Sequence, residues 1–192
     1  MLQSIILSLA VLFSSGESTT ATYAVDTSTS TVNWVGKKVT GQHNGTVEIK
    51  EGSLEYGDGK LTGGSFTINM ASIVSLDLEG EWKGKLEGHL KSDDFFGVEK
   101  YPTSTFVIKK AKALGKGKFD VTGDVTIKGT TETVNFPVQI VEAGDKVIGT
   151  AAIVIDRSKF GVKYGSGSFF DDLGDKTIYD DFELSVKIEA SK

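Results

Sequence analysis

The chain has 192 residues and a net charge of −5, and 39% of its residues are hydrophobic. This length suits one domain with a sizeable core, and the composition excludes wholesale disorder. The chain has no cysteine and no stripe of basic residues, which excludes disulfides, thiolate metal sites, cysteine nucleophiles and nucleic-acid binding through phosphates.

The first predicted element is an N-terminal export signal. Residues 1–13 form an apolar stretch that is too short to cross a bilayer, which needs about 20 residues, so we expect no integral membrane span. Small residues at 14–16 and a Ser/Thr-rich run at 17–22 are typical of a signal peptide and a flexible leader. A first strand or a buried helix is the alternative. We therefore predict a leader over residues 1–22, a single domain over 23–192, and a periplasmic or secreted location.

From residue 23 onward, apolar residues alternate with polar ones in eight segments. Such alternation is typical of β-strands with one buried and one solvated face. Gly-rich turns separate the segments and indicate an all-β sandwich or barrel. Gly123 favours a barrel, because glycine permits a sharp bend or leaves room within a long strand. The apolar positions are Val32 and Trp34; Val47 and Ile49; Phe66, Ile68 and Met70; Phe106 and Ile108; Phe119, Val121, Val125 and Ile127; Val134, Phe136, Val138 and Ile140; Val147, Gly149, Ala151, Ile153 and Ile155; and Phe182, Leu184, Val186 and Ile188.

One stretch breaks the alternation and predicts a helix. Residues 81–92 place Trp82, Leu86 and Leu90 at helical spacing among charged residues. An aromatic loop follows at 92–97, and Tyr101 and Pro102 precede the next strand. We expect this helix and loop to lie over one end of a barrel.

Few side chains are arranged for catalysis or metal binding. His43 and His89 belong to no metal or hydrolase motif, and no phosphate-binding loop is present. Arg157, the only arginine, lies where a strand meets a loop and favours pairing with a carboxylate such as Asp156, with contact to an anionic head group as the alternative. We expect no catalytic residue, metal site or cofactor. The acidic loop lacks the spacing of a calcium site: Asp171, Asp172, Asp175, Asp180 and Asp181.

Large aromatic rings in the loops indicate an apolar cavity. Five phenylalanines lie outside the alternating strands, in Gly-flanked segments, where they must bury against something or leave an exposed patch. They plug the barrel ends as core or line the mouth of a cavity. Small inward residues such as Gly149 leave volume for a long apolar ligand. The candidate binding residues are Trp34, Phe66, Ile68, Phe95, Phe96, Tyr101, Phe106, Phe119, Ile127, Phe160, Phe169, Phe170 and Phe182, with His89 and Arg157 as candidate contacts to a head group.

Four ordered segments resemble the YceI-like family of bacterial lipid-binding proteins. They are residues 89–102 (HLKSDDFFGVEKYP), 123–131 (GDVTIKGTT), 155–162 (IDRSKFGV) and the closing acidic loop with its strand. The resemblance implies an extended, eight-stranded, lipocalin-like antiparallel barrel. It also implies binding of a polyisoprenoid, an isoprenoid quinone or a fatty-acid derivative, outside the cytoplasm and often as a homodimer.

Three functions compete at this point. The first is a carrier or sequestering module for a long apolar molecule, without enzymatic activity. The second is a secreted hydrolase that uses a carboxylate and histidine site, with His89 and Asp172 as its test positions. The third is an adhesive or structural β-domain with a solid core, which a structure without a cavity would select.

Overall fold

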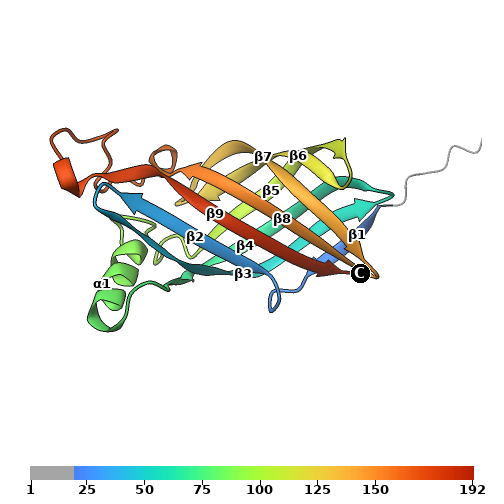
Figure 1. Ribbon diagram of the computed structural model, residues 1–192, viewed down its shortest axis with the longest axis horizontal. Coiled ribbons are helices and arrows are strands. Elements are labelled where there is room, and N and C mark those ends of the chain that lie inside the picture. Colours follow the sequence, from blue (N-terminus) through green and yellow to red (C-terminus); the bar gives the residue numbers. More distant parts are fainter. Residues whose placement is uncertain (1–19) are drawn as a thin grey trace, which may run out of the picture.

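In residues 20–192, which the computed structural model describes, nine strands and one α-helix form an elongated antiparallel barrel (Figure 1). Residues 1–19 of the signal peptide and leader predicted over residues 1–22 lie outside this part of the chain. The elements are β1 (Ala21–Val25), β2 (Thr31–Lys38), β3 (Gly41–Gly57), β4 (Lys60–Ser75), α1 (Gly80–Lys91), β5 (Thr103–Gly115), β6 (Lys118–Ile127), β7 (Thr130–Ala143), β8 (Lys146–Asp156) and β9 (Ile178–Ser191), with short 3₁₀ turns at Arg157–Phe160 and Gly174–Lys176.

The sheet closes on itself as a barrel of eight staves, where a stave is one strand position around the barrel. Its strand order is β3-β2-β9-β8-β7-β6-β5-β4, and β4 pairs again with β3. β1 and β2 share one stave, because both lie between β3 and β9, β1 toward one end and β2 toward the other. This confirms the predicted eight-stranded antiparallel barrel. Closure leaves the long strands without a free edge for pairing with another chain.

β1 is the one strand that the alternation did not predict. It begins at Ala21, so Ala21 and Thr22, which were assigned to the leader, belong to the barrel. Its five residues are too few to show a clear period beside the Ser/Thr-rich run, and its position comes from pairing with Ser53–Tyr56 of β3 and with the end of β9. Tertiary pairing therefore extends the barrel beyond its local sequence signal.

Three of the hairpins turn through two residues with positive φ. Asp58-Gly59, Lys116-Gly117 and Lys128-Gly129 all have φ between 49° and 77° at both positions. This left-handed backbone is what two-residue type I′ hairpins require, and its twist matches that of the flanking strands. These turns set the register of β3–β4, β5–β6 and β6–β7.

One end of the barrel is filled by its own side chains. Tyr23, Tyr56 and Phe119 are buried there, with ring centroids 6.4 Å apart from Tyr23 to Tyr56 and from Tyr56 to Phe119. The Tyr56 hydroxyl donates a 2.8 Å hydrogen bond to Oε1 of Glu142. Burial raises the pKa of Tyr56 to about 12, and the Glu142 carboxylate acts in the same direction. This end is a solid core.

The opposite end is covered by α1 and the loop after it (Figure 1). Leu90 of α1 packs with Met70 and Ile73 of β4 and with Val98 of the loop. The backbone N–H of Ser75 also donates to Oε1 of Glu87, at 2.9 Å, which ties the helix to the strand before it. The helix predicted at 81–92 is therefore confirmed, and so is its place over one end.

The segment between β4 and α1 is held by the carboxylate of Asp77. Its Oδ1 accepts from the backbone N–H of Asn44 at 3.0 Å and from Oγ of Ser75 at 2.9 Å, and its Oδ2 lies 2.7 Å from Nδ1 of His43. Burial alone would raise the pKa of Asp77, but the hydrogen bonds from Asn44, His43 and Ser75 lower it to about 2. The ionised carboxylate is therefore favoured in the folded state.

We expect Asp77→Asn to lower the free energy of unfolding by about 1–2 kcal/mol at pH 7. The unfolded chain binds this proton near the ordinary pKa of 3.8 and the folded chain only near 2, so the contribution is nearly complete above about pH 5 and is lost as the pH falls toward 2. Urea titrations of both proteins at pH 7, 4 and 2.5 measure this. A stability difference that stayed constant down to pH 2.5 would contradict the assignment.

Gly123 leaves room for an aromatic ring. A Cβ atom at this position would lie 2.4 Å from Cε2 of Phe106 and 2.5 Å from the backbone oxygen of Val107. Phe106 uses the space to pack between Phe66 and Phe136, with centroid separations of 6.3 and 5.3 Å. The glycine therefore places three rings against the interior of the barrel.

Candidate functional site

A cavity of about 260 Å³ runs inside the barrel, between the solid end and the end beneath α1. This volume is close to the lower end of the range for ligand pockets, about 300–1,000 Å³. The wall is almost wholly apolar, and residues from all eight staves contribute to it. Because an apolar cavity of this kind stays dry, it favours hydrocarbon over water. The cavity contradicts the solid-core alternative.

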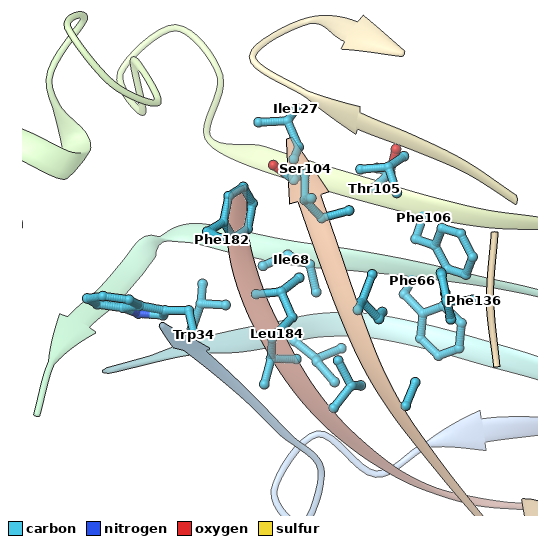
Figure 2. Close-up of a pocket in the computed structure, with 18 of the residues that line it drawn as sticks. Trp34, Phe66, Ile68, Ser104, Thr105, Phe106, Ile127, Phe136, Phe182 and Leu184 are labelled. Atoms are coloured by element: carbon cyan, nitrogen blue, oxygen red, sulfur yellow. The ribbon is translucent and has the colours of Figure 1, made fainter. Parts of the chain in front are cut away.

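Aromatic rings line the cavity at two depths. Phe66, Phe106 and Phe136 form one group in the barrel, and Trp34 and Phe182 lie apart from them (Figure 2). Aliphatic side chains such as Ile68 and Leu184 lie between the two groups in the same view. The wall is thus continuous along the barrel and suits a long, narrow occupant better than a compact one.

The position of Trp34 depends on the glycine beside it. A Cβ atom on Gly45 of β3 would lie 2.6 Å from the Trp34 ring. The indole Nε1 donates to the backbone oxygen of Thr46 at 3.2 Å, so the polar edge of the ring is satisfied and its apolar face lines the cavity.

An aromatic cluster forms the wall near α1. Phe95 lies 6.0 Å from Phe96, 5.1 Å from His89 and 6.0 Å from Tyr164, and Phe96 lies 6.4 Å from Phe182 of β9. These contacts join α1, the loop after it and the segment that follows β8. Phe95 and Phe96 line the cavity, whereas His89 packs behind them and pairs with Asp94, with Nε2 3.8 Å from Oδ2.

Arg157 is a structural clamp in the wall. Its side chain is 3% exposed. Its N–H groups donate to four backbone carbonyls, from Nε to Tyr179 at 3.1 Å, from Nη1 to Val162 at 3.0 Å and Tyr164 at 2.9 Å, and from Nη2 to Ile178 at 2.9 Å. Nη2 also lies 3.3 Å from Oδ1 of Asp180.

These contacts give the guanidinium four hydrogen bonds to backbone carbonyls and an ion pair with Asp180, whose Oδ1 accepts no hydrogen bond. Burial lowers the pKa of Arg157, while the carboxylates of Asp180 and Asp156 raise it; the group stays charged because its ordinary pKa is so high. The geometry matches structural pairing, which the sequence favoured, although the main partners are carbonyl oxygens and the carboxylate is Asp180. Asp156 instead caps the next turn, accepting from the backbone N–H of Ser158 at 2.9 Å.

Proteins of similar sequence identify the family of this chain. A family model for the YceI-like domain matches residues 23–190. The chain belongs to the YceI-like family. A UPF0312 protein of Pseudomonas putida strain W619 is 31% identical over 199 aligned residues, which cover 94% of this chain and 92% of the relative. A UPF0312 protein of Photorhabdus laumondii is 31% identical over 143 residues, covering 69% and 72%.

Solved structures share the YceI-like barrel. BcnA of Burkholderia cenocepacia superposes with a TM-score of 0.73 at 26% identity, covering 87% of this chain and 99% of BcnA. A polyisoprenoid-binding domain from Saccharophagus degradans has a TM-score of 0.64 at 13% identity, covering 88% and 97%, a level of identity that indicates the fold alone. The Campylobacter jejuni YceI protein has a TM-score of 0.59 at 24% identity, covering 75% and 82%.

Many of the residues predicted from sequence do lie in the wall of this YceI-like barrel. They are Trp34, Phe66, Ile68, Phe95, Phe96, Phe106, Ile127, Phe182 and Arg157. The strand residues among them follow from the alternation, because inward positions of a closed barrel face its interior.

Six other predicted residues do not line the cavity, namely His89, which packs behind Phe95, and the five described next. Phe119 is part of the solid end, and Phe160 is 2% exposed and packs on Ile127 and Ile155. Tyr101 lies against Gly129, where it fastens the loop after α1 to the β6–β7 turn. Phe169 and Phe170 are 43% and 50% exposed, and Nζ of Lys163 lies 5.0 Å from the Phe169 ring centroid. The prediction that these six bind the ligand has no support from their positions.

Two kinds of wall residue are absent from the candidates predicted from the sequence. Phe136, Leu184 and Val186 line the cavity from inward strand positions, and the alternation of apolar and polar residues is the signal that identifies them. Ser104 also stands at an inward position of β5, two residues before Phe106, and is buried in the wall. A single polar residue at an inward position was the signal that could have found it.

The described residues offer little for catalysis or metal binding at the cavity. Within residues 20–192, no three His, Asp or Glu side chains lie close enough together to hold a metal ion. The His43–Asp77 pair belongs to the β4–α1 connection, and the His89–Asp94 pair lies behind the wall. None of the α-helices over the same range is both long and apolar enough to span a bilayer.

Proposed function

We propose that this protein binds a long-chain apolar molecule, such as a polyisoprenoid, an isoprenoid quinone or a fatty-acid derivative, and carries or sequesters it without chemical change. The observation that carries the proposal is the apolar cavity along the barrel. Membership of the YceI-like family supports it, as does the likeness to the polyisoprenoid-binding domain of Saccharophagus degradans.

The energetics favour a chain over a compact ligand. Each methylene group that leaves water for a dry apolar wall contributes about 0.8 kcal/mol, so affinity rises with the length of chain that the cavity accommodates. A compact ring of the same volume would leave part of a narrow cavity empty and would forfeit contacts along it. We expect affinity to rise with chain length until the cavity is full and then to level off.

The decisive experiment is to identify what the protein carries. We expect native mass spectrometry of protein purified from a membrane-containing lysate to show a bound isoprenoid or acyl compound that solvent extraction releases. At 100 times the dissociation constant, a ligand stabilises the folded state by about 2.7 kcal/mol, so rebinding should raise Tm by about 5–10 °C. Protein that is repeatedly purified empty, and whose Tm does not respond to such compounds, would overturn the proposal.

A further inference from the structure

Among the described residues, two buried side-chain atoms have no hydrogen-bond partner, Oγ of Ser104 and Oδ1 of Asp180, and of these two residues only Ser104 lines the cavity. It is 8% exposed, lines the cavity, and its Oγ makes no hydrogen bond within residues 20–192. By contrast, the indole Nε1 of Trp34 in the same wall donates to the backbone oxygen of Thr46, and the buried Tyr56 hydroxyl donates to Glu142. A buried hydroxyl without a hydrogen bond costs about 1–3 kcal/mol, so its presence in an apolar wall calls for a partner.

The position of Ser104 gives the depth of that partner. Ser104 is the second residue of β5 and pairs with Ile68 of β4. β5 begins just after the loop that follows α1, so the hydroxyl lies toward the α1 end of the cavity. Figure 2 shows it near Ile127 and Phe182, apart from the group of Phe66, Phe106 and Phe136. A ligand oxygen at Ser104 leaves the rest of the barrel for an apolar tail.

The charges around the cavity decide what kind of oxygen this is. Arg157 and Asp181 are the charged residues of the wall within the described chain, and the guanidinium is already bound to four backbone carbonyls and ion-paired with Asp180. Asp181 also belongs to a shallow pocket beside the cavity that holds Lys37, Asp156, Asp180 and Glu183, and Lys37 is paired with Glu183. An anionic head group would therefore meet carboxylates and no available cation.

An uncharged oxygen is not repelled by these carboxylates and needs no cation to pair with. Burying a carboxylate or phosphate without a paired cation is far more costly than burying a hydroxyl, carbonyl or ester that has one hydrogen bond. A hydroxyl such as Ser104 can donate to a carbonyl or ester and can also accept from an alcohol. The side chain therefore suits any of these neutral groups.

We propose that Ser104 is a specificity-determining residue that hydrogen-bonds an uncharged oxygen of the ligand, so that the barrel selects neutral oxygenated chains, such as alcohols, esters or quinone-type carbonyls, over anionic lipids. This inference rests on the proposed function and adds the class of head group and its place, with the oxygen near the α1 end and the tail toward the aromatic group of Phe66, Phe106 and Phe136.

The test compares four probes of matched chain length on the full chain. Dissociation constants for dodecan-1-ol, methyl dodecanoate, dodecane and dodecanoate are measured by displacement of a fluorescent apolar probe, for the wild type, Ser104→Ala and Ile153→Ala. We expect Ser104→Ala to weaken the alcohol and the ester about fivefold, the worth of one hydrogen bond, and to leave dodecane within twofold. Dodecanoate should bind most weakly to every protein.

The control and the stability readout separate this role from others. Ile153→Ala removes only hydrocarbon from the wall, so it should weaken all probes by a similar factor. A serine with no partner in the protein loses nothing when it becomes alanine, so the Tm of ligand-free Ser104→Ala should equal or exceed that of the wild type. A fall of several degrees would show an internal structural partner and overturn the inference.

The remaining outcomes are also distinct. If Ser104→Ala changes the affinity for all four probes equally, or for none, the hydroxyl does not select the head group and the inference is wrong while the proposed function stands. If dodecanoate binds the wild type as tightly as the alcohol, selection against anions is wrong. If no probe binds the wild type, the proposed function itself fails.

Discussion

Replacing Gly149 by leucine is expected to weaken ligand binding about 50-fold without unfolding the protein. Gly149 lines the cavity, and a Cβ atom there would approach only Cβ of Ile188, at 4.0 Å. The new side chain would enter open space and displace about three carbons of a bound chain, each of which contributes about 0.8 kcal/mol to the binding free energy. Because it fills a cavity rather than an already packed core, the ligand-free protein should be at least as stable as the wild type.

A matched control comes from α1. Gly84 is exposed and has nothing within 4 Å of its Cβ position. Gly84→Leu therefore makes the same chemical change outside the cavity, and we expect its affinity to match that of the wild type. Dissociation constants for dodecan-1-ol and thermal melts of both variants provide the measurement. Unchanged affinity in a folded Gly149→Leu protein would show that the ligand does not occupy this part of the barrel.

The contrast between Gly149 and Gly123 shows that the sequence alone does not predict which inward glycine leaves cavity volume. Both glycines stand at inward positions of long strands and carry the same local signal. In the structure, Gly149 faces open cavity, whereas the space beside Gly123 is filled by the Phe106 ring. Which glycine leaves volume depends on a side chain from the neighbouring strand, and strand register is not visible in a single segment.

The strands and the helix were predictable because each has its own period. Alternation identified the eight long segments and most of the strand residues in the wall, and helical spacing identified α1. The loop aromatics have no such rule. Phe95 and Phe96 line the cavity, Phe160 is core and Phe169 is exposed, although all four lie next to glycines or other aromatics in the sequence. Their roles follow from loop paths that long-range contacts determine.

Arg157 is the clearest case of a role that only the structure provides. The sequence suggested a carboxylate partner, but its principal partners are backbone oxygens of Val162, Tyr164, Ile178 and Tyr179, up to 22 residues away. Every residue has a backbone carbonyl, so the sequence does not reveal which carbonyls accept these hydrogen bonds. The clamp nevertheless determines how the segment after β8 returns to β9, and therefore the shape of the wall beside Phe95, whose ring centroid lies 5.4 Å from Cζ of Arg157.

Arg157→Met is expected to lower the free energy of unfolding by about 4 kcal/mol, the largest stability effect that we expect from a single change in this protein. Methionine replaces much of the apolar stem but none of the donors. Four backbone carbonyls would lose a charged donor, and Oδ1 of Asp180 would lose the contact that it makes at 3.3 Å. Urea denaturation at pH 7 measures the loss.

Two further variants separate the carbonyl clamp from the ion pair. Arg157→Lys keeps the charge but offers three donors from one point, which cannot reach carbonyls on both sides as the planar guanidinium does, so we expect most of the loss to remain. Asp180→Asn removes the charge pair and leaves the carbonyl bonds intact, so it should cost about 1 kcal/mol or less. If lysine restores wild-type stability, the ion pair dominates and the clamp interpretation is wrong.

The same variants link stability to the cavity. The backbone that Arg157 holds includes Ile178 and Tyr179, which line the cavity, so releasing it should open the wall near α1 as well as destabilise the fold. We expect limited proteolysis of Arg157→Met to cut within residues 161–178 under conditions in which the wild type stays intact. Cleavage there, together with weaker binding of every probe irrespective of its head group, would identify Arg157 as a positioning residue. It would also distinguish it from Ser104, whose loss is expected to affect only the oxygenated chains.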